Sequence, residues 1–307
     1  MSEVKGRFVG LEGYPSKDIN YHTYFLNPYR LTQEKSKQSI KINTPQNHGL
    51  LTGEWMGAAI LGESPTDQRL DDGLAAVFES EILQYELDVL GYPLLKVKLN
   101  SDKPKAMLFA QLSEATEDGF VQRVSYGVLN LALNKERSEF TPLIKDEWIQ
   151  RELRLDCCGH RFAKGSKIRL SLATTFWLMP ESVTLTLDLN ECDFALPVFS
   201  GKDSNKVNLE AQSAPLTPLT LLKEGRVDRS INYDILSDTY TCITNGVGGV
   251  FGKGVYRFDE IDVLVEHNLK RELVLQNENP LSAKYTIIQK MKIGRENCMV
   301  DADIILT

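Results

Sequence analysis

The sequence predicts an all-β fold, a jelly-roll β-sandwich of two packed sheets, and three observations support this prediction. Apolar and polar residues alternate with a period of two from about residue 74 onward, which is typical of strands with one buried face. The alternating runs are short, turn-forming residues bound them, and no convincing helical period lies between them. About eight such runs precede residue 200, and this number suits a jelly roll.

The clearest strand is the stretch VTLTLDL, in which Val183, Leu185, Leu187 and Leu189 fall on one face. The same alternation occurs in YELDV, LLKVKLN and KIRLSL, so each of these runs is expected to bury every second side chain. A Glu-Asp-Gly turn at residues 117–119 separates two further alternating runs, MLFAQLSEA and FVQRVSYGVL. This arrangement predicts a β-hairpin.

Composition divides the chain into three parts. Residues 1–65 are polar but carry many aromatics, so they are expected to form an ordered arm on a neighbouring surface rather than a disordered tail. Residues 66–204 hold the predicted sandwich, and the polar, proline-containing stretch 200–215 marks its end. Residues 205–307 return to alternating runs and form either an extension of the sandwich or a small second β domain. Their glycine-rich stretch NGVGGVFGKG (245–254) is predicted to be a hairpin tip.

Composition also excludes several classes of protein. The 307 residues carry a formal net charge of −7, and Lys and Arg are spread along the chain, so no basic stripe for nucleic acid exists. No apolar run approaches the roughly 18 residues that predict a membrane span, and the first residues lack the apolar core of a signal peptide. The five cysteines are scattered, which is typical of a reducing compartment, and we therefore expect a cytoplasmic protein.

The motifs of the common catalytic classes are missing from the chain. No G-x-S-x-G elbow occurs, and its nearest imitation, RVSYGVL, has Arg123 in place of the first glycine. Ser125 is therefore interpreted as an ordinary strand serine. The motif CCGHRF places His160 beside Cys157 and Cys158, but a zinc site usually needs a second ligand pair at similar spacing, and none exists.

The acidic cluster Asp67, Asp71 and Asp72 could bind a cation through its carboxylates. However, it lacks the residue order of a calcium loop, so solvated or ion-paired acids are the favoured interpretation. The glycines of residues 245–254 lack the Walker pattern that cradles phosphate. The sequence thus predicts no catalytic residue, no metal and no cofactor within this chain.

One family resemblance covers nearly the whole chain. The stretch DQRLDDGLAAVFES, followed by EILQYELDVLGYPLLKVKLNSDKP, resembles the start of the C-terminal β-sandwich of the X-prolyl dipeptidyl aminopeptidase and cocaine esterase family of serine hydrolases. The segments FAQLSEATEDGFVQRVSYGVLNLAL, HRFAKGSKIRLSLATTFW and ENPLSAKY are similar to later parts of that region. EGYPSKDINYHTYFLNPYRL resembles the segment that joins the hydrolase domain to the sandwich, and this resemblance implies that residues 1–65 are a linker that would follow a hydrolase domain.

The resemblance implies a galactose-binding-like jelly roll that packs on an α/β-hydrolase domain. Members of the family cleave X-Pro dipeptides, esters or acyl-amides through Ser, Asp and His in the hydrolase domain, and no position of this chain matches these three residues. The chain would be a non-catalytic C-terminal domain that shapes the substrate cleft of a hydrolase domain, in the same polypeptide or on a separate subunit. The residues expected to contact that domain are Arg69, Asp72, Tyr24 and Trp55.

Other functions stay open at this stage. A stand-alone module could bind a carbohydrate or a peptide, with Trp55, Trp148 and Trp177 as residues for ring stacking, although core positions are the simpler interpretation of these tryptophans. A thiol enzyme built on CCGHRF would require a lowered thiol pKa, and only two flanking basic residues favour one. Self-association into a homo-oligomer also stays open.

Overall fold

The computed structural model describes residues 6–54, 57, 62–134, 138–177, 183–201, 217–249 and 252–307 of the chain. Strands dominate this part of the molecule, which otherwise contains one four-residue helix and two short 3-10 turns. No helix in it has the length and apolar character needed to cross a membrane. The chain divides into unit 1, Met1–Thr52 with Pro65–Ala211, and unit 2, Gly53–Ser64 with Gln212–Thr307. The fold class predicted from the sequence, all-β, is confirmed.

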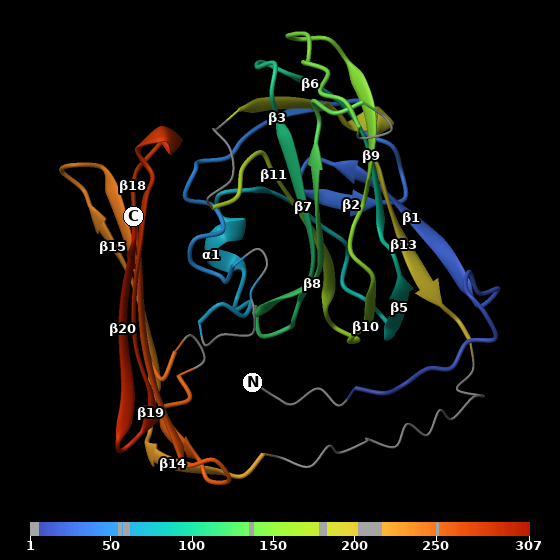
Figure 1. The fold of residues 1–307 in the computed structure, drawn as a ribbon. Coiled ribbons are helices and arrows are strands. Elements are labelled where there is room, and N and C mark those ends of the chain that lie inside the picture. The colour runs from blue at the N-terminus through green and yellow to red at the C-terminus, as the bar shows by residue number, and fades with distance from the viewer. Residues whose placement is uncertain are drawn as a thin grey trace. The chain divides into compact units, whose positions relative to one another are not determined.

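Unit 1 contains thirteen strands and the helix α1 (Figure 1). These elements are β1 Ile19–Asn27, β2 Arg30–Thr32, β3 Ser39–Asn43, α1 Arg69–Asp72, β4 Ala76–Glu79, β5 Leu87–Gly91, β6 Leu94–Ser101, β7 Met107–Ala115, β8 Val121–Asn130, β9 Ile149–Arg154, β10 Cys158–Phe162, β11 Lys167–Ala173, β12 Thr184–Asp188 and β13 Asp193–Phe199. A 3-10 turn, Leu189–Glu191, joins the last two strands.

The strands of unit 1 form two layers around one core. Hydrogen bonds connect them in the order β3-β12-β6-β13-β1-β2-β4-β11-β7-β8, with β9 paired to β6 and β5 paired to β10 and β13. A single parallel residue pair between β2 and β4 joins the two halves of this path. Side chains of both halves meet in one buried cluster, which includes Phe78, Leu112, Leu170, Leu99, Leu187 and Phe194. This arrangement is that of a sandwich, whereas the jelly-roll order of the connections stays a prediction.

The period-two pattern correctly identifies the buried face of the central strands. Leu185 and Leu187 of β12 are fully buried, and the alternate residues of β6 and β11 show the same pattern. The predicted hairpin is also confirmed, because β7 and β8 pair across the Glu-Asp-Gly turn. Gly119 has a φ of +85° in this turn, a conformation that glycine adopts without steric cost.

Part of the segment 1–65 contributes directly to the sandwich. β1 pairs with β13 over the whole stretch from Ile19↔Phe199 to Phe25↔Asp193, and β3 pairs with β12 at the end of the sheet. The strands β1, β2 and β3 thus belong to unit 1, and the backbone groups of β1 and β3 complete the ladders of β13 and β12. Their assignment to a linker stays a prediction.

Unit 2 is one sheet of seven strands. They are β14 Leu219–Lys223, β15 Arg226–Asp234, β16 Thr239–Val247, β17 Val255–Phe258, β18 Val263–Gln276, β19 Lys284–Arg295 and β20 Cys298–Leu306, and a 3-10 turn, Pro280–Ser282, precedes β19. β18 is central: β16 and β17 pair with one side of it, and β19, followed by β20, pairs with the other.

The predicted hairpin tip in the glycine-rich stretch is wrong. β16 pairs with β15 and β18, and β17 pairs with β14 and β18, so the two strands that flank this stretch do not pair with each other. The reason is the length of β18, whose 14 residues accommodate the two shorter strands one after the other. Residues 250 and 251 of the stretch lie outside the described part.

A short segment from the N-terminal half of the chain belongs to unit 2. Glu63 is buried and pairs with Arg271 of β18 at 2.8 Å, and Glu54 pairs with Arg229 of β15 at 2.8 Å. The guanidinium of Arg229 also donates to the carbonyl of Gly62. These ion pairs attach residues 53–64 to the sheet of unit 2. The predicted domain boundary at 200–215 falls almost entirely outside the described residues.

Candidate functional site

The acidic stretch that opens the predicted sandwich folds as the helix α1, which is held against the start of β8. Asp67 accepts hydrogen bonds from the backbone N–H groups of Arg69 and Val121, both at 3.2 Å. The N–H of Gln68 donates to the carbonyl of Val121 at 3.0 Å. The side chains of Arg69, the first residue of the helix, and Asp72, the last, therefore lie in different surroundings.

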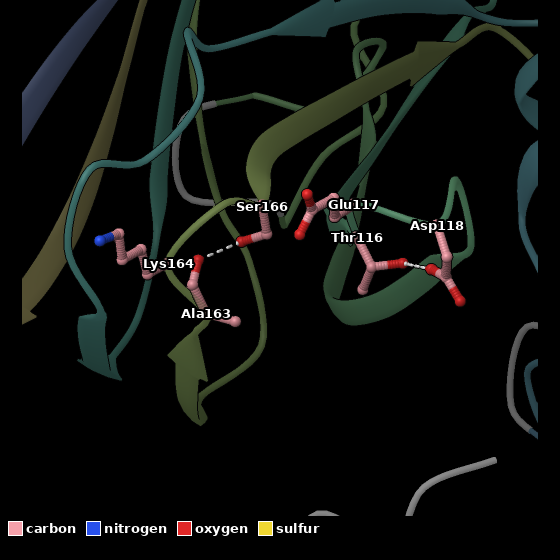
Figure 2. Close-up of a pocket in the computed structure, with 6 residues that line it drawn as sticks. All are labelled: Thr116, Glu117, Asp118, Ala163, Lys164 and Ser166. Carbon is pink, nitrogen blue, oxygen red and sulfur yellow. Dashed lines mark hydrogen bonds between the residues drawn. The ribbon is translucent and has the colours of Figure 1, made fainter.

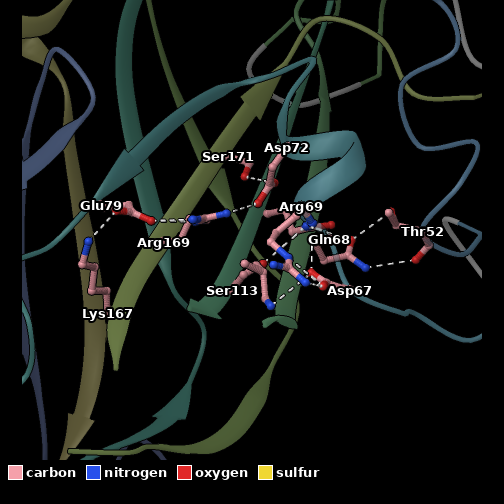
Figure 3. A network of polar contacts seen from close by, with 12 residues as sticks. Thr52, Asp67, Gln68, Arg69, Asp72, Glu79, Ser113, Lys167, Arg169 and Ser171 are labelled. Carbon is pink, nitrogen blue, oxygen red and sulfur yellow. Dashed lines mark hydrogen bonds and ion pairs between the residues drawn. The ribbon is translucent and has the colours of Figure 1, made fainter. Parts of the chain in front are cut away.

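A chain of ion pairs runs from α1 across the outer face of β11 and β4 (Figure 3). The carboxylate of Asp72 binds Arg169 at 2.7 Å and accepts a hydrogen bond from the hydroxyl of Ser171. Arg169 also binds Glu79 at 2.5 Å, and Lys167 binds the second oxygen of Glu79 at 2.9 Å. Burial acts to raise the pKa of Glu79, but the hydrogen bonds from Lys167 and Arg169 outweigh it and hold the pKa below its usual value.

A second set of hydrogen bonds ties α1 to the chain at Thr52. The buried carboxylate of Asp71 accepts from both the N–H and the hydroxyl of Thr52. The amide of Gln68 donates to the carbonyl of Thr52 at 3.0 Å and accepts from Gln111 of β7 at 3.0 Å. These contacts fix the position of α1 on the sheet, which is a structural role.

Arg69 and Asp72 were both predicted to contact a partner domain, but their exposure and their partners differ in the structure. Arg69 remains largely exposed while its guanidinium pairs with Asp67, and the hydrogen bond from Arg69 lowers the pKa of Asp67. Asp72 is only 5% exposed and is fully occupied by Arg169 and Ser171. Its carboxylate is satisfied inside unit 1, so an interface at this place would use Arg69.

The two predicted aromatic contacts also differ. Tyr24 pairs across the strands with Phe194 and packs against the core, and burial raises the pKa of its hydroxyl. Most of the Tyr24 ring therefore packs against the core of unit 1. Trp55 lies outside the described residues, and its predicted contact stays a prediction.

A cluster of exposed tyrosines lies on the opposite face of β1. Tyr14 and Tyr92 meet edge to face with ring centroids 6.3 Å apart, and the hydroxyl of Tyr21 donates to the carbonyl of Tyr92 at 3.0 Å. The guanidinium of Arg154, at the end of β9, lies 4.7 Å from the centre of the Tyr92 ring. Tyr14 and Tyr21 remain 59% and 47% exposed. We call Tyr14, Tyr21, Tyr92 and Arg154 the tyrosine patch.

Sequence reasoning found only part of the tyrosine patch. Tyr14 and Tyr21 counted among the aromatics of the N-terminal segment, but Tyr92 and Arg154 carried no signal because strand pairing brings them there from distant positions. The alternation of β1 does place Tyr21 and Tyr24 on opposite faces of the strand. Burial, and next to it the neighbouring Tyr14, raises the pKa of Tyr21.

Two residues of the CCGHRF motif, Cys158 and His160, have surroundings that do not favour thiol chemistry. Burial, followed by the neighbouring Cys157, raises the pKa of Cys158 to about 12, whereas a nucleophilic cysteine needs a lowered pKa. The Nε2 of His160 is engaged 2.7 Å from the carboxylate of Glu114. Glu114 also accepts from the N–H of Ala163, so it links β7 to the end of β10.

The serine and metal hypotheses find no support among the described residues. Ser125 is buried in β8, and its hydroxyl donates to the carbonyl of Asp156 at 2.6 Å. No group of three or more His, Cys, Asp or Glu side chains in the described part is placed to hold a metal ion.

One open pocket lies where the β7–β8 turn approaches the β10–β11 turn (Figure 2). Its lining residues are Thr116, Glu117, Asp118, Ala163, Lys164 and Ser166. Figure 2 shows Lys164 pointing away from the two acidic side chains. The hydroxyls of Thr116 and Ser166 are occupied by Asp118 and by the carbonyl of Ala163. The pocket therefore lacks a set of polar groups that converge on a ligand.

Comparison with known families matches most of this architecture. The family profile described as X-Pro dipeptidyl-peptidase C-terminal non-catalytic domain matches residues 1–212. This range includes all strands of unit 1 and the tyrosine patch, and it ends before the strands of unit 2. No curated protein gives a significant match to the chain.

Several solved structures share the fold. A CocE/NonD family hydrolase from Staphylococcus aureus superposes with a TM-score of 0.50 at 14% identity, over 64% of this chain and 39% of that chain. An aminopeptidase from the marine sediment archaeon Thaumarchaeota archaeon gives a TM-score of 0.54 at 13% identity, over 62% of this chain and 38% of that one. The match to an α-amino acid ester hydrolase covers 57% and 36%, with a TM-score of 0.50 at 14% identity. This chain thus spans less than two fifths of the length of each.

Proposed function

Because the chain belongs to the family of X-Pro dipeptidyl-peptidase C-terminal non-catalytic domains, we propose that unit 1 packs on an α/β-hydrolase domain outside these 307 residues and shapes its substrate cleft. The hydrolase would act on X-Pro peptides, esters or acyl-amides through an acyl-enzyme intermediate. It would share one polypeptide with this chain or form a separate subunit. The role of the present chain would be to dock on the hydrolase domain and to shape its substrate cleft.

The tyrosine patch is the observation that carries this proposal. Tyrosine and arginine are enriched at protein interfaces, since a ring supplies contact area at a small entropic cost and keeps a polar end for a hydrogen bond. The rings of Tyr14 and Tyr21 are held in place by Tyr92 and its backbone, so little ordering would be needed on binding. Two of its residues, Tyr14 and Tyr21, belong to the N-terminal segment, the part that resembles a linker from a hydrolase domain.

The network around α1 gives the proposal a second element. Arg69 is exposed, and the ion pair with Asp67 holds its guanidinium at a fixed place beside the β7–β8 turn. Asp72 and Arg169 act behind it by fixing α1 to the sheet. Arg69 would therefore be a polar contact at the rim of the interface.

The deciding experiment is the mass of the native polypeptide, detected in its own cells with peptides from this chain. A product larger than 34.6 kDa by a hydrolase domain, or a stable complex with an α/β-hydrolase subunit, supports the proposal. A free product of 34.6 kDa without such a subunit contradicts it.

Variants then test the surface in the assembled hydrolase. Tyr14→Ser and Tyr21→Ser should loosen the docking, seen as faster proteolysis between the domains and a lower thermal midpoint of the hydrolase domain. Tyr85→Ser is the matched control, because Tyr85 is 83% exposed and has no part in the patch. Equal effects of all three substitutions would remove the tyrosine patch from the proposal.

Exposed aromatic rings also favour the alternative of a carbohydrate- or peptide-binding module. Trp148 is 43% exposed, which differs from the core position favoured by the sequence, although the ammonium of Lys98 lies over its ring at 5.7 Å. Trp177 is half-buried. Quenching of tryptophan fluorescence by oligosaccharides or proline-rich peptides, lost in Trp148→Ala, would establish this second function.

A further inference from the structure

Three strands of unit 2 lie at the edges of its sheet. Within the described part of the chain, β14, β15 and β20 each pair with a single neighbouring strand. The open edge of such a strand presents backbone N–H and C=O groups that another strand can bind. Proteins usually protect these edges by a short strand, a bulge or charged side chains, and the three edges of unit 2 differ in this protection.

Two of the edge strands are protected against pairing with a copy of themselves. β14 has only five residues, and its register with β17 shifts between Leu221 and Lys223. In β20, an antiparallel pair centred on Ala302 would place Asp301 opposite Asp303 of the other copy. A pair centred on either aspartate would place that residue opposite itself. Like charges directly opposite each other are destabilising, so neither strand is suited to self-pairing.

The third edge strand, β15, is long and regular. It has nine residues and no proline, and it pairs with β16 from Arg226↔Val247 to Asp234↔Thr239 without a shift in register. Residues 53–64 are attached to this strand at Arg229, on the odd-numbered side. The five even-numbered side chains of β15 are all exposed. A further strand can therefore be added at this edge.

The charges of β15 complement those of a second copy. In an antiparallel pair centred on Ser230, Arg226 of each copy stands opposite Asp234 of the other. In the same register, Asp228 stands opposite Asn232. Opposite charges directly across two strands are stabilising. This register includes all nine residues of the strand and brings no like charges opposite each other.

The neighbouring registers do bring like charges together. Two copies related by a two-fold axis pair each residue with one on the same side of the sheet, so the centre moves by whole residues. A centre at Arg229 places this arginine opposite itself, and a centre at Ile231 places Asp228 opposite Asp234. The charge pattern thus selects the register with the largest number of paired residues.

The odd-numbered side of β15 is compatible with the same register. Val227 would stand opposite Tyr233, which is 42% exposed, and such pairs of a β-branched and an aromatic residue are stabilising. Arg229 would stand opposite Ile231, and its charge is already neutralised by Glu54 at 2.8 Å. The contact therefore brings no unpaired charge together on this side.

We propose that unit 2 associates with a second copy of this chain through antiparallel pairing of the two β15 strands about a two-fold axis at Ser230. The two sheets would form one continuous sheet, joined by about eight to ten backbone hydrogen bonds. Two-fold contacts are the commonest form of self-association. The contact area of a strand edge is small, so the dimer is expected to be weak and reversible. The family profile ends before the strands of unit 2, so this contact is separate from the one proposed for unit 1.

Disulfide trapping of the full chain tests the register. Two cysteines introduced at position 230 would be directly opposite, and a Cα separation of about 4.5–5.5 Å is within disulfide reach. Ser230→Cys should therefore give a covalent dimer under mild oxidation, and peptide mass spectrometry should locate the bond between the introduced thiols. The matched control is Asn232→Cys, exposed on the same side of β15. Its two copies would lie about 14 Å apart, too far for a disulfide.

Sedimentation velocity measures the association itself. Between about 5 and 500 μM, the unsubstituted chain should show a concentration-dependent species of twice 34.6 kDa. Arg226→Glu should weaken the association about tenfold, because it replaces two cross-strand ion pairs by two pairs of like charges. The matched control is Arg257→Glu on β17, an interior strand. Both arginines pair with an aspartate two residues further along the chain, but only Arg226 lies on the proposed edge.

The outcomes decide the proposal, provided that circular dichroism shows the strand content of each variant to be unchanged. Failure of Ser230→Cys to form the disulfide overturns the proposal, whether or not another dimer forms. Equal trapping of Ser230→Cys and Asn232→Cys also overturns it, because random collisions would then explain the bond. A dimer that Arg226→Glu and Arg257→Glu weaken equally would contradict a contact through β15.

Discussion

Unit 1 and unit 2 are built from antiparallel strands of the same kind, but they differ in the number of layers. In unit 1 the apolar sides of two layers meet, and residues such as Leu170 and Phe194 are completely buried. Unit 2 has a single sheet with residues 53–64 attached to it; residues at the centre of one face, such as Leu275, are buried, and the margins of that face are exposed. Alternation therefore predicts which side of a strand is apolar, but a second layer is needed to make that side a core.

The largest difference should appear when a core side chain is truncated. Phe194→Ala in unit 1 is expected to cost about 3–5 kcal/mol of unfolding free energy, because it leaves a cavity where both layers meet. Leu306→Ala, on an exposed strand margin of unit 2, should cost less than about 1 kcal/mol. Urea unfolding of both variants, followed by circular dichroism, measures these values. Equal costs would show that unit 2 has a covered core as well.

Breaking an ion pair should reveal a smaller difference in unfolding free energy between the two units. Arg169→Met removes the cation from the buried carboxylate of Asp72 and should cost about 3 kcal/mol, since the remaining charge is left unpaired. Lys290→Ala breaks the exposed pair with Asp303 in unit 2 and should cost less than about 1 kcal/mol. The double variant Arg169→Met with Asp72→Asn should recover part of the loss, and no recovery would argue against an unpaired charge as the cause.

Acid should affect unit 1 first. Burial acts to raise the pKa of Glu114, but the hydrogen bonds from His160 and the N–H of Ala163 outweigh it and hold the pKa below its usual value. The stabilisation is therefore complete above the unfolded pKa of about 4.3 and is lost as the pH falls through the lower folded pKa. Thermal midpoints measured from pH 6 to pH 3 should fall for unit 1, and Glu114→Gln should make this fall shallower. An unchanged slope in the variant would contradict the role of Glu114.

Thiol labelling compares the local opening of the two units, and it is the smallest of the expected effects because it requires no large loss of stability. Burial raises the pKa of Cys192 in unit 1 to about 12 and that of Cys242 in unit 2 to about 11. The exposed Cys157 should react with iodoacetamide at once and serves as the control. In moderate urea Cys242 should react before Cys192, because a single-layer sheet opens more easily than a two-layer core. Peptide mass spectrometry follows each site, and the reverse order would mean that unit 2 is the more protected.

The sequence by itself determined the local features of this protein. Alternation identified the apolar side of β6, β11 and β12, and the Glu-Asp-Gly turn identified the β7–β8 hairpin. The short motifs were sufficient to suggest the family, which the match to residues 1–212 shows. All of these signals depend on neighbours a few residues apart, and such neighbours are visible in any sequence.

Tertiary structure decided the features that depend on distant residues. Asp72 and Arg69 stand three residues apart, yet a partner from β11 buries the first while the second remains exposed. Tyr92 and Arg154 join the tyrosine patch only because strand pairing brings them beside β1. Residues 53–64 belong to unit 2 through ion pairs with strands more than 160 positions away. Which surface is covered depends on long-range pairing, and the period of a single strand carries no information about its partner in the next layer.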